Sequence, residues 1–238
     1  MTEEELPTYA DSTEINISPA DISVAPETFY AAERFIYDSQ PNGLPIYELS
    51  HSLGFLGDSD RTVRFQRLDR QVKHSAGSAP QITVRQRCLY DLKHPAPGTF
   101  PTVPFHAEPS SRQALCKFGL ESCRAKGRLF TKGFRICRAT RPGKSVDDEK
   151  SSRSLVTRRD GRGVTNALAL GDELFTAVPT KDKSTFEWLD ANGTVVAREG
   201  RKDQQLLSLS VLTDMSSPNR DALMVSWILR VWYDLAQG

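Results

Sequence analysis

The end of the chain carries an almost unbroken apolar segment. Residues 221–235 read DALMVSWILRVWYDL, and after Asp221 only Ser226, Arg230 and Asp234 interrupt the apolar run. These three residues are spaced by four, so on an α-helix they form one narrow polar stripe. A helix that is apolar almost all round is surrounded either by protein or by lipid. The pattern therefore predicts a helix around which the other elements of the fold pack.

The residues before this segment suit the start of a helix. Ser217 is an expected N-cap, and Pro218 fits the first helical position because its missing N–H would be unpaired there. As a helix the segment rises roughly 23 Å, whereas a membrane span needs about twenty apolar residues. Arg230 and Asp234 would lie in hydrocarbon, and no basic flank follows them. A buried helix is therefore favoured over a membrane anchor.

Upstream of the helix, short runs with β-type alternation predominate. Strands are expected at 34–37, 46–49, 62–68, 82–90 and 206–212. The clearest hairpin joins 185–188 to 194–197, and its turn contains Asn192-Gly193, which supplies the positive φ of a tight hairpin turn. Many short strands predict a mainly-β fold. A closed antiparallel barrel around the C-terminal helix fits both patterns, because closure leaves no sheet edge and the helix provides a core.

Two segments lack a pattern that would fold. Residues 1–27 contain seven Asp or Glu, three prolines and no Lys or Arg, so we expect a disordered acidic tail there. Residues 142–163 are polar and rich in Gly and Ser, and we expect a flexible loop. The folded domain is therefore predicted over residues 28–238, a usual size for one domain.

Composition narrows the function classes. The net charge of +1 argues against a globally basic nucleic-acid binder, so nucleic acid is not an expected partner. The N-terminal residues lack the apolar run of a signal peptide, and we expect a cytoplasmic protein, with peripheral membrane association and a nuclear location left open. The chain has four cysteines, Cys88, Cys116, Cys123 and Cys137, and they form no C-x-x-C motif. We therefore expect reduced thiols, no metal site and no cofactor.

Several segments, in their order along the chain, resemble a known family. They are FYAAERFIYDS (29–39), PIYELS (45–50), TVRFQRLD (62–69), LYDLKHP (89–95), GDELFTA (171–177), FEWLDANGTVVARE (186–199) and DALMVSWILRVWYDLA (221–236). The set resembles the fungal tubby C-terminal-like proteins, which share a barrel-around-helix fold with tubby, the phospholipid scramblases and the plant LURP-one-related proteins. The resemblance implies that fold. It implies little about activity, because one fold hosts many functions.

One stretch of the chain is strongly basic. It contains eight basic residues and no acid: Arg124, Lys126, Arg128, Lys132, Arg135, Arg138, Arg141 and Lys144. Such a stretch suits the phosphates of lipid headgroups. Tubby binds phosphoinositides through Lys and Arg on its barrel, so the resemblance makes anionic phospholipid the first candidate ligand. Alternatively, these charges simply lie on a solvated outer face of alternating strands. Not all eight can face one way, because successive side chains leave opposite sides of a strand.

The sequence contains no motif of a known catalytic site. His51, His74, His94 and His106 are scattered, and no H-x-x-x-H, G-x-S-x-G, P-loop or G-x-G-x-x-G is present. We therefore expect a non-enzymatic binding or adaptor protein that acts on anionic membrane lipids or on a protein partner. The alternative is a small-molecule-binding accessory protein or an enzyme of a fungal metabolic pathway, with a pocket at the barrel mouth. A pocket lined by convergent polar groups would favour this alternative.

Overall fold

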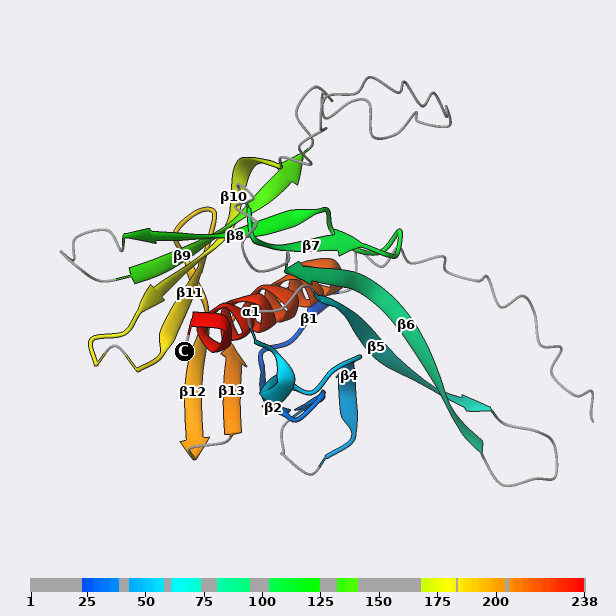
Figure 1. Ribbon diagram of the computed structural model, residues 1–238. Coiled ribbons are helices and arrows are strands. Elements are labelled where there is room, and N and C mark those ends of the chain that lie inside the picture. Colours follow the sequence, from blue (N-terminus) through cyan, green and yellow to red (C-terminus); the bar gives the residue numbers. More distant parts are fainter. Residues whose placement is uncertain are drawn as a thin grey trace, which may run out of the picture.

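A closed antiparallel barrel surrounds a single helix (Figure 1). The computed structural model describes residues 23–38, 43–57, 61–73, 81–94, 103–124, 132–140, 168–182, 184–203 and 206–237. Residues 1–22 of the predicted tail and the loop predicted at 142–163 lie outside the described residues. The barrel strands are β2 (Glu27–Ala32), β3 (Phe35–Asp38), β4 (Pro45–Leu49), β5 (Arg61–Lys73), β6 (Gln81–His94), β7 (Phe105–Pro109), β8 (Phe118–Arg124), β9 (Lys132–Thr140), β10 (Ala169–Pro179), β11 (Phe186–Asp190), β12 (Val195–Asp203) and β13 (Leu206–Val211).

The strands follow one another around the barrel in chain order. β13 pairs with β2 and closes the ring, with Leu209 opposite Phe29 and Ser210 opposite Thr28. A short 3₁₀ helix, η2 (Leu53–Phe55), lies between β4 and β5. Closure pairs both sides of the sheet, which removes the exposed edges of an open sheet. The predicted mainly-β barrel is confirmed.

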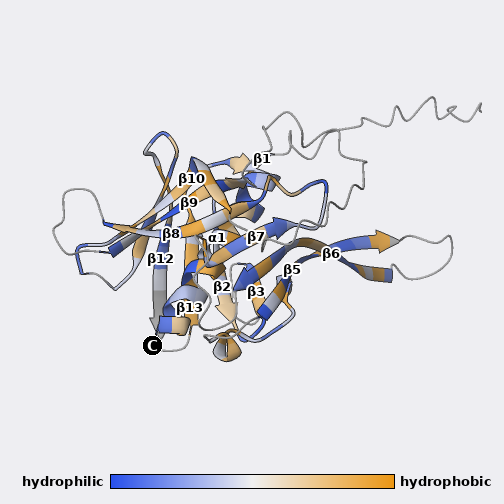
Figure 2. Ribbon diagram, turned by 45° about the horizontal axis from the view of Figure 1, so that its top comes forward, coloured by the Kyte–Doolittle hydropathy of each residue, from blue (hydrophilic) through white to orange (hydrophobic). Residues whose placement is uncertain are grey.

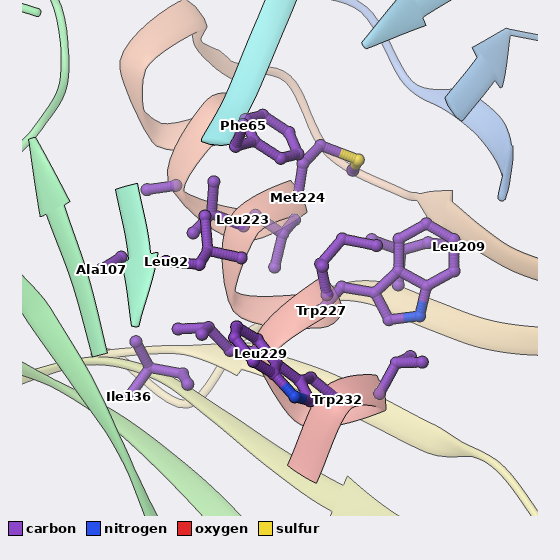
Figure 3. Packing of buried hydrophobic residues seen from close by; sticks show 14 of the residues in the cluster. Phe65, Leu92, Ala107, Ile136, Leu209, Leu223, Met224, Trp227, Leu229 and Trp232 are labelled. Atoms are coloured by element: carbon purple, nitrogen blue, oxygen red, sulfur yellow. The ribbon is translucent and has the colours of Figure 1, made fainter. Parts of the chain in front are cut away.

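The helix α1 (Ser217–Gln237) occupies the barrel axis. Twelve consecutive residues, Asp221–Trp232, are buried, so every side of the helix contacts the barrel wall. Figure 3 shows Phe65, Leu92, Ile136 and Leu209, each from a different strand, around the helix. The helix therefore provides the core that the sequence predicted. No helix in the described part of the chain is long and apolar enough to cross a membrane.

The β11–β12 hairpin has the predicted turn. Gly193 has a φ of 82°, which favours glycine. The carboxylate oxygen Oδ1 of Asp190 accepts hydrogen bonds from the backbone N–H groups of Asn192 at 2.9 Å and Thr194 at 2.8 Å. The turn is therefore held by the side chain of its first residue as well as by its backbone.

The structure differs from the sequence prediction at the N-terminal boundary. Residues 23–27 were predicted as part of the tail, but β1 (Ser23–Val24) pairs with β14 (Met215–Ser216) and β2 begins at Glu27. The pair β1–β14 lies directly before the helix. These residues lack apolar periodicity, and their strand partners come from the far end of the chain, so local sequence did not reveal them.

Two strands are longer than predicted and leave the barrel together. β5 and β6 pair from Arg61 opposite His94 to Lys73 opposite Gln81, and their outer part projects away from the barrel as a two-stranded ribbon (Figure 1). Arg67 at the base of this ribbon donates hydrogen bonds of 2.9 Å to the carboxylate of Asp221 and to the hydroxyl of Ser217. The ribbon therefore leaves the barrel at the end where α1 begins.

Candidate anion-binding surface

The basic residues predicted as a site are distributed over β8, β9 and the chain around them. Arg124 lies on β8, and Lys132, Arg135 and Arg138 lie on β9. Lys126, Arg128, Arg141 and Lys144 are outside the described residues. Strand alternation divides the described four: Lys132 and Arg138 have the parity of the inward residues Phe134 and Ile136, whereas Arg135 has the opposite parity. The four therefore do not form one continuous face.

Arg124 and Lys132 lie together at one end of the barrel. They are direct partners in the β8–β9 register, and both are exposed. The Lys132 ammonium donates a hydrogen bond of 2.8 Å to the Tyr233 hydroxyl and lies 4.1 Å from the centre of its ring, a cation–π contact. We call Arg124, Lys132 and Tyr233 the rim cluster.

Arg135 is on the outside of the wall and is neutralised there. Its guanidinium donates a hydrogen bond of 2.6 Å to Glu121 on the neighbouring strand β8. This contact raises the pKa of Arg135, and both side chains are nearly half exposed. An exposed pair of this kind contributes little to stability, but it leaves less positive charge for an external anion.

Arg138 lies far from the rim cluster. It is opposite Phe118 in the register, whereas Lys132 is opposite Arg124 six residues further along the same pair of strands. Its Nε is buried and has no hydrogen-bond partner among the described residues. Arg138 is only partly exposed and is separated from Arg124 and Lys132 along the strands, so it is not part of the rim cluster.

A groove of about 630 Å³ runs along the outside of β8 to β11. Its polar lining comes from Arg124, Arg135, Glu173, Asp190 and Asn192, and its apolar lining includes Val178 and Leu189. The hydroxyl of Thr176 donates a hydrogen bond to Glu173. Cys123 also lines the groove, and burial raises its pKa, so the thiol is protonated near neutral pH. The groove thus contains both signs of charge and no activated nucleophile among its described residues.

The described histidines do not converge. His94 packs on Phe105 with ring centres 4.3 Å apart, and the His51 ring lies 2.9 Å from the Ser50 hydroxyl. Burial and the nearby Lys117 lower the pKa of His106 to about 4, so this side chain is neutral at pH 7. Within the described ranges, no three His, Cys, Asp or Glu side chains are grouped as metal ligands would be.

Sequence reasoning missed a second basic stretch on the β5–β6 ribbon. No Asp or Glu occurs between Arg70 and Tyr90, while Arg70, Lys73, Arg85 and Arg87 do. The absence of Asp and Glu from this stretch was the sequence feature that could have revealed it. The lower density of basic residues, interrupted by a polar segment at 74–80, made this stretch less conspicuous than residues 124–144.

No known protein family, curated protein or solved structure matches the chain. The resemblance to the fungal tubby C-terminal-like proteins therefore stays a prediction.

Proposed function

We propose that this protein is a non-enzymatic binding or adaptor protein that associates peripherally with anionic phospholipids through the rim cluster. The observation that carries the proposal is the register pair Arg124–Lys132, two exposed cations side by side at one end of the barrel. Tyr233, in the last turns of the helix, contacts Lys132. Cations beside an amphipathic aromatic side chain suit the interface between headgroups and acyl chains.

The rim cluster supports a weak and reversible association. Each Lys or Arg near an anionic leaflet contributes about 1 kcal/mol, and the attraction fades within a Debye length. The two described cations would therefore contribute about 2 kcal/mol. Lys126 and Arg128 lie between them in the sequence and raise this to about 4 kcal/mol if they join the contact. Such an association depends strongly on salt.

The filled barrel favours a binding function on the outer surface. Because α1 and its surrounding side chains occupy the axis, the candidate ligand sites of the described residues lie on the outside of the wall and at its ends. The outer groove supports the alternative function. Its volume falls in the range of small-molecule sites, and several polar side chains converge on it.

Liposome co-sedimentation tests the proposal. Full-length protein is mixed with vesicles of neutral phosphatidylcholine, with and without a phosphoinositide, at low and at high salt. We expect binding to anionic vesicles at low salt only. Arg124→Glu/Lys132→Glu should abolish it, whereas the control Arg64→Glu/Arg112→Glu, which makes the same change in charge at other exposed positions, should retain it. If the wild type does not sediment with anionic vesicles at low salt, the proposal is wrong and the outer groove becomes the better candidate.

A further inference from the structure

The outer part of β6 has a free strand edge. β6 pairs with β5 along its whole length, but β7 pairs only with Tyr90–Lys93. Within the described part of the chain, no strand pairs with the other side of residues 81–88. The backbone N–H and C=O groups along that side can therefore accept another extended segment, as in recognition by strand addition.

The ribbon also has an apolar face. Val72 is opposite Ile82 in the register, and Val84 follows Ile82 on the same side of β6. These side chains are 55%, 67% and 54% exposed, respectively. Hydrophobic positions colour the end of the ribbon in Figure 2. A strand added beside β6 would extend this face, and apolar side chains at its alternate positions would pack against Ile82 and Val84.

The charge of the ribbon specifies an acidic occupant. Between Arg70 and Tyr90 all charged residues are basic. Arg87 is bound by Asp69 at 3.0 Å, but Arg85 is exposed and makes no ion pair with a described residue. A second copy of β6 would bring two more arginines and no acid from residues 81–88, so the net interaction of the charges would be repulsive. A bilayer interior would leave the backbone groups of the edge unpaired.

We propose that residues 11–18 of the same chain supply this strand. Residues 12–18 read STEINIS, in which Ile15 and Ile17 alternate with polar residues, and residues 1–22 contain six Asp or Glu and no Lys or Arg. Pro19 has no N–H, so the paired part ends at Ser18. An acidic segment with this alternation complements both the charge and the apolar face of the ribbon.

The proposed segment joins the barrel at the end from which the β5–β6 ribbon projects. Ser23 is opposite Ser216, and the next residue, Ser217, accepts the hydrogen bond from Arg67. Arg67 is in turn directly opposite Arg87 of β6. The chain from Ser18 to Ser23 spans at most about 17 Å, which is the reach that the proposal requires between β1 and the edge of β6. The contact would cover the open edge and neutralise the ribbon, independently of the rim cluster at the other end of the helix.

Hydrogen exchange tests this inference. The amide exchange of residues 81–88 is measured in the full chain at low salt, for the wild type and for Asp11→Lys/Glu14→Lys. We expect several-fold faster exchange in the variant. The control Glu3→Lys/Glu4→Lys, with the same change in net charge, should resemble the wild type. The variant Glu14→Arg/Arg85→Glu, in which the two charges are swapped, should again show slow amide exchange.

Three results would overturn the inference. The first is identical exchange in the wild type and in Asp11→Lys/Glu14→Lys. The second is protection in the wild type that disappears on dilution, which would identify a second copy as the occupant. The third is protection that appears only with anionic vesicles, which would identify lipid. Each can occur whether or not the rim cluster binds phospholipid, so this test is separate from that of the proposed function.

Discussion

Arg230 of α1 and Glu199 of β12 face each other inside the barrel, with Nε of Arg230 2.7 Å from Oε1 of Glu199. Both side chains are 6% exposed. The N–H bond at this nitrogen does not point at the oxygen, so the contact is an ion pair without a well-formed hydrogen bond. The Trp188 indole donates a hydrogen bond of 2.9 Å to the same oxygen. Burial nevertheless raises the pKa of Glu199 to about 7, against the opposing effects of Arg230 and Trp188.

This pKa predicts a pH dependence that Glu199→Gln removes. Between pH 4.5 and 7 the folded protein keeps a proton on Glu199 that the unfolded chain has lost, so the free energy of unfolding falls as pH rises. Gln does not ionise. We therefore expect the variant to match the wild type near pH 4.5 and to be more stable at pH 8, by up to about 3 kcal/mol.

Urea denaturation of both proteins across this pH range checks the prediction. The comparison must be made at each pH, because the lowered pKa of His106 makes both proteins more stable as pH rises from 4 to 6.5. A variant that is less stable than the wild type at pH 8 would contradict the prediction. It would show that attraction to Arg230 outweighs the burial of the carboxylate.

Trp232→Ala should destabilise the protein severely. Trp232 is fully buried, its indole donates a hydrogen bond of 3.1 Å to the Gly57 carbonyl, and its ring centre lies 5.8 Å from that of Phe105. Truncation leaves a large cavity and an unpaired carbonyl, for which we expect a loss of about 3–5 kcal/mol. Leu235→Ala, at an exposed position three residues later, should change stability by only about 0.5 kcal/mol. Chemical denaturation of both variants measures the difference, and equal losses would contradict an enclosed helix.

The helix and one hairpin could be predicted because their signals are local. The apolar circumference of residues 221–235 specifies burial on all sides, and Asn192-Gly193 specifies a tight turn. The ion pair between Arg230 and Glu199 could not be predicted, because it depends on where β12 lies against the helix. The polar stripe of Ser226, Arg230 and Asp234 showed only that some buried polar partner was needed.

The candidate site was predicted less well than the fold. Eight basic residues in one stretch suggested a single surface, but pairing of β8 with β9 neutralises Arg135 with Glu121, and the Nε of Arg138 is buried. Only Arg124 and Lys132 of the described residues remain together and exposed. A count of basic residues along the sequence does not show which of them share one side of a strand or which residues lie opposite them. Both decide whether the charges form one surface.

Gly119→Ala should destabilise β8, and Val103→Ala should reduce the loss. A Cβ at position 119 would lie 2.3 Å from Cγ1 of Val103 and 3.2 Å from Cδ2 of Leu170, in a small apolar cluster outside the barrel wall. Overpacking of this kind costs about 1–3 kcal/mol. Because Val103→Ala removes the clashing methyl group, the double variant should be more stable than the sum of the two single losses predicts. Simple additivity in a double-mutant cycle would contradict the contact.

Two truncations separate the tail from the first strands. Removal of residues 1–22 leaves β1 and every barrel strand in place, so it should lower the melting temperature only by what the strand proposed beside β6 contributes. Removal of residues 1–28 also deletes the pairing of Ser23–Val24 with β14, the register pairs Glu27–Val211 and Thr28–Ser210, and the 3.0 Å contact between the hydroxyls of Thr28 and Ser210. At about 1 kcal/mol for each hydrogen bond lost, we expect a loss of at least about 2 kcal/mol. For a chain of this length that lowers the melting temperature by about 4–8 °C. Thermal unfolding followed by circular dichroism measures both values, and equal melting temperatures would show that residues 23–28 add nothing to the closure of the barrel.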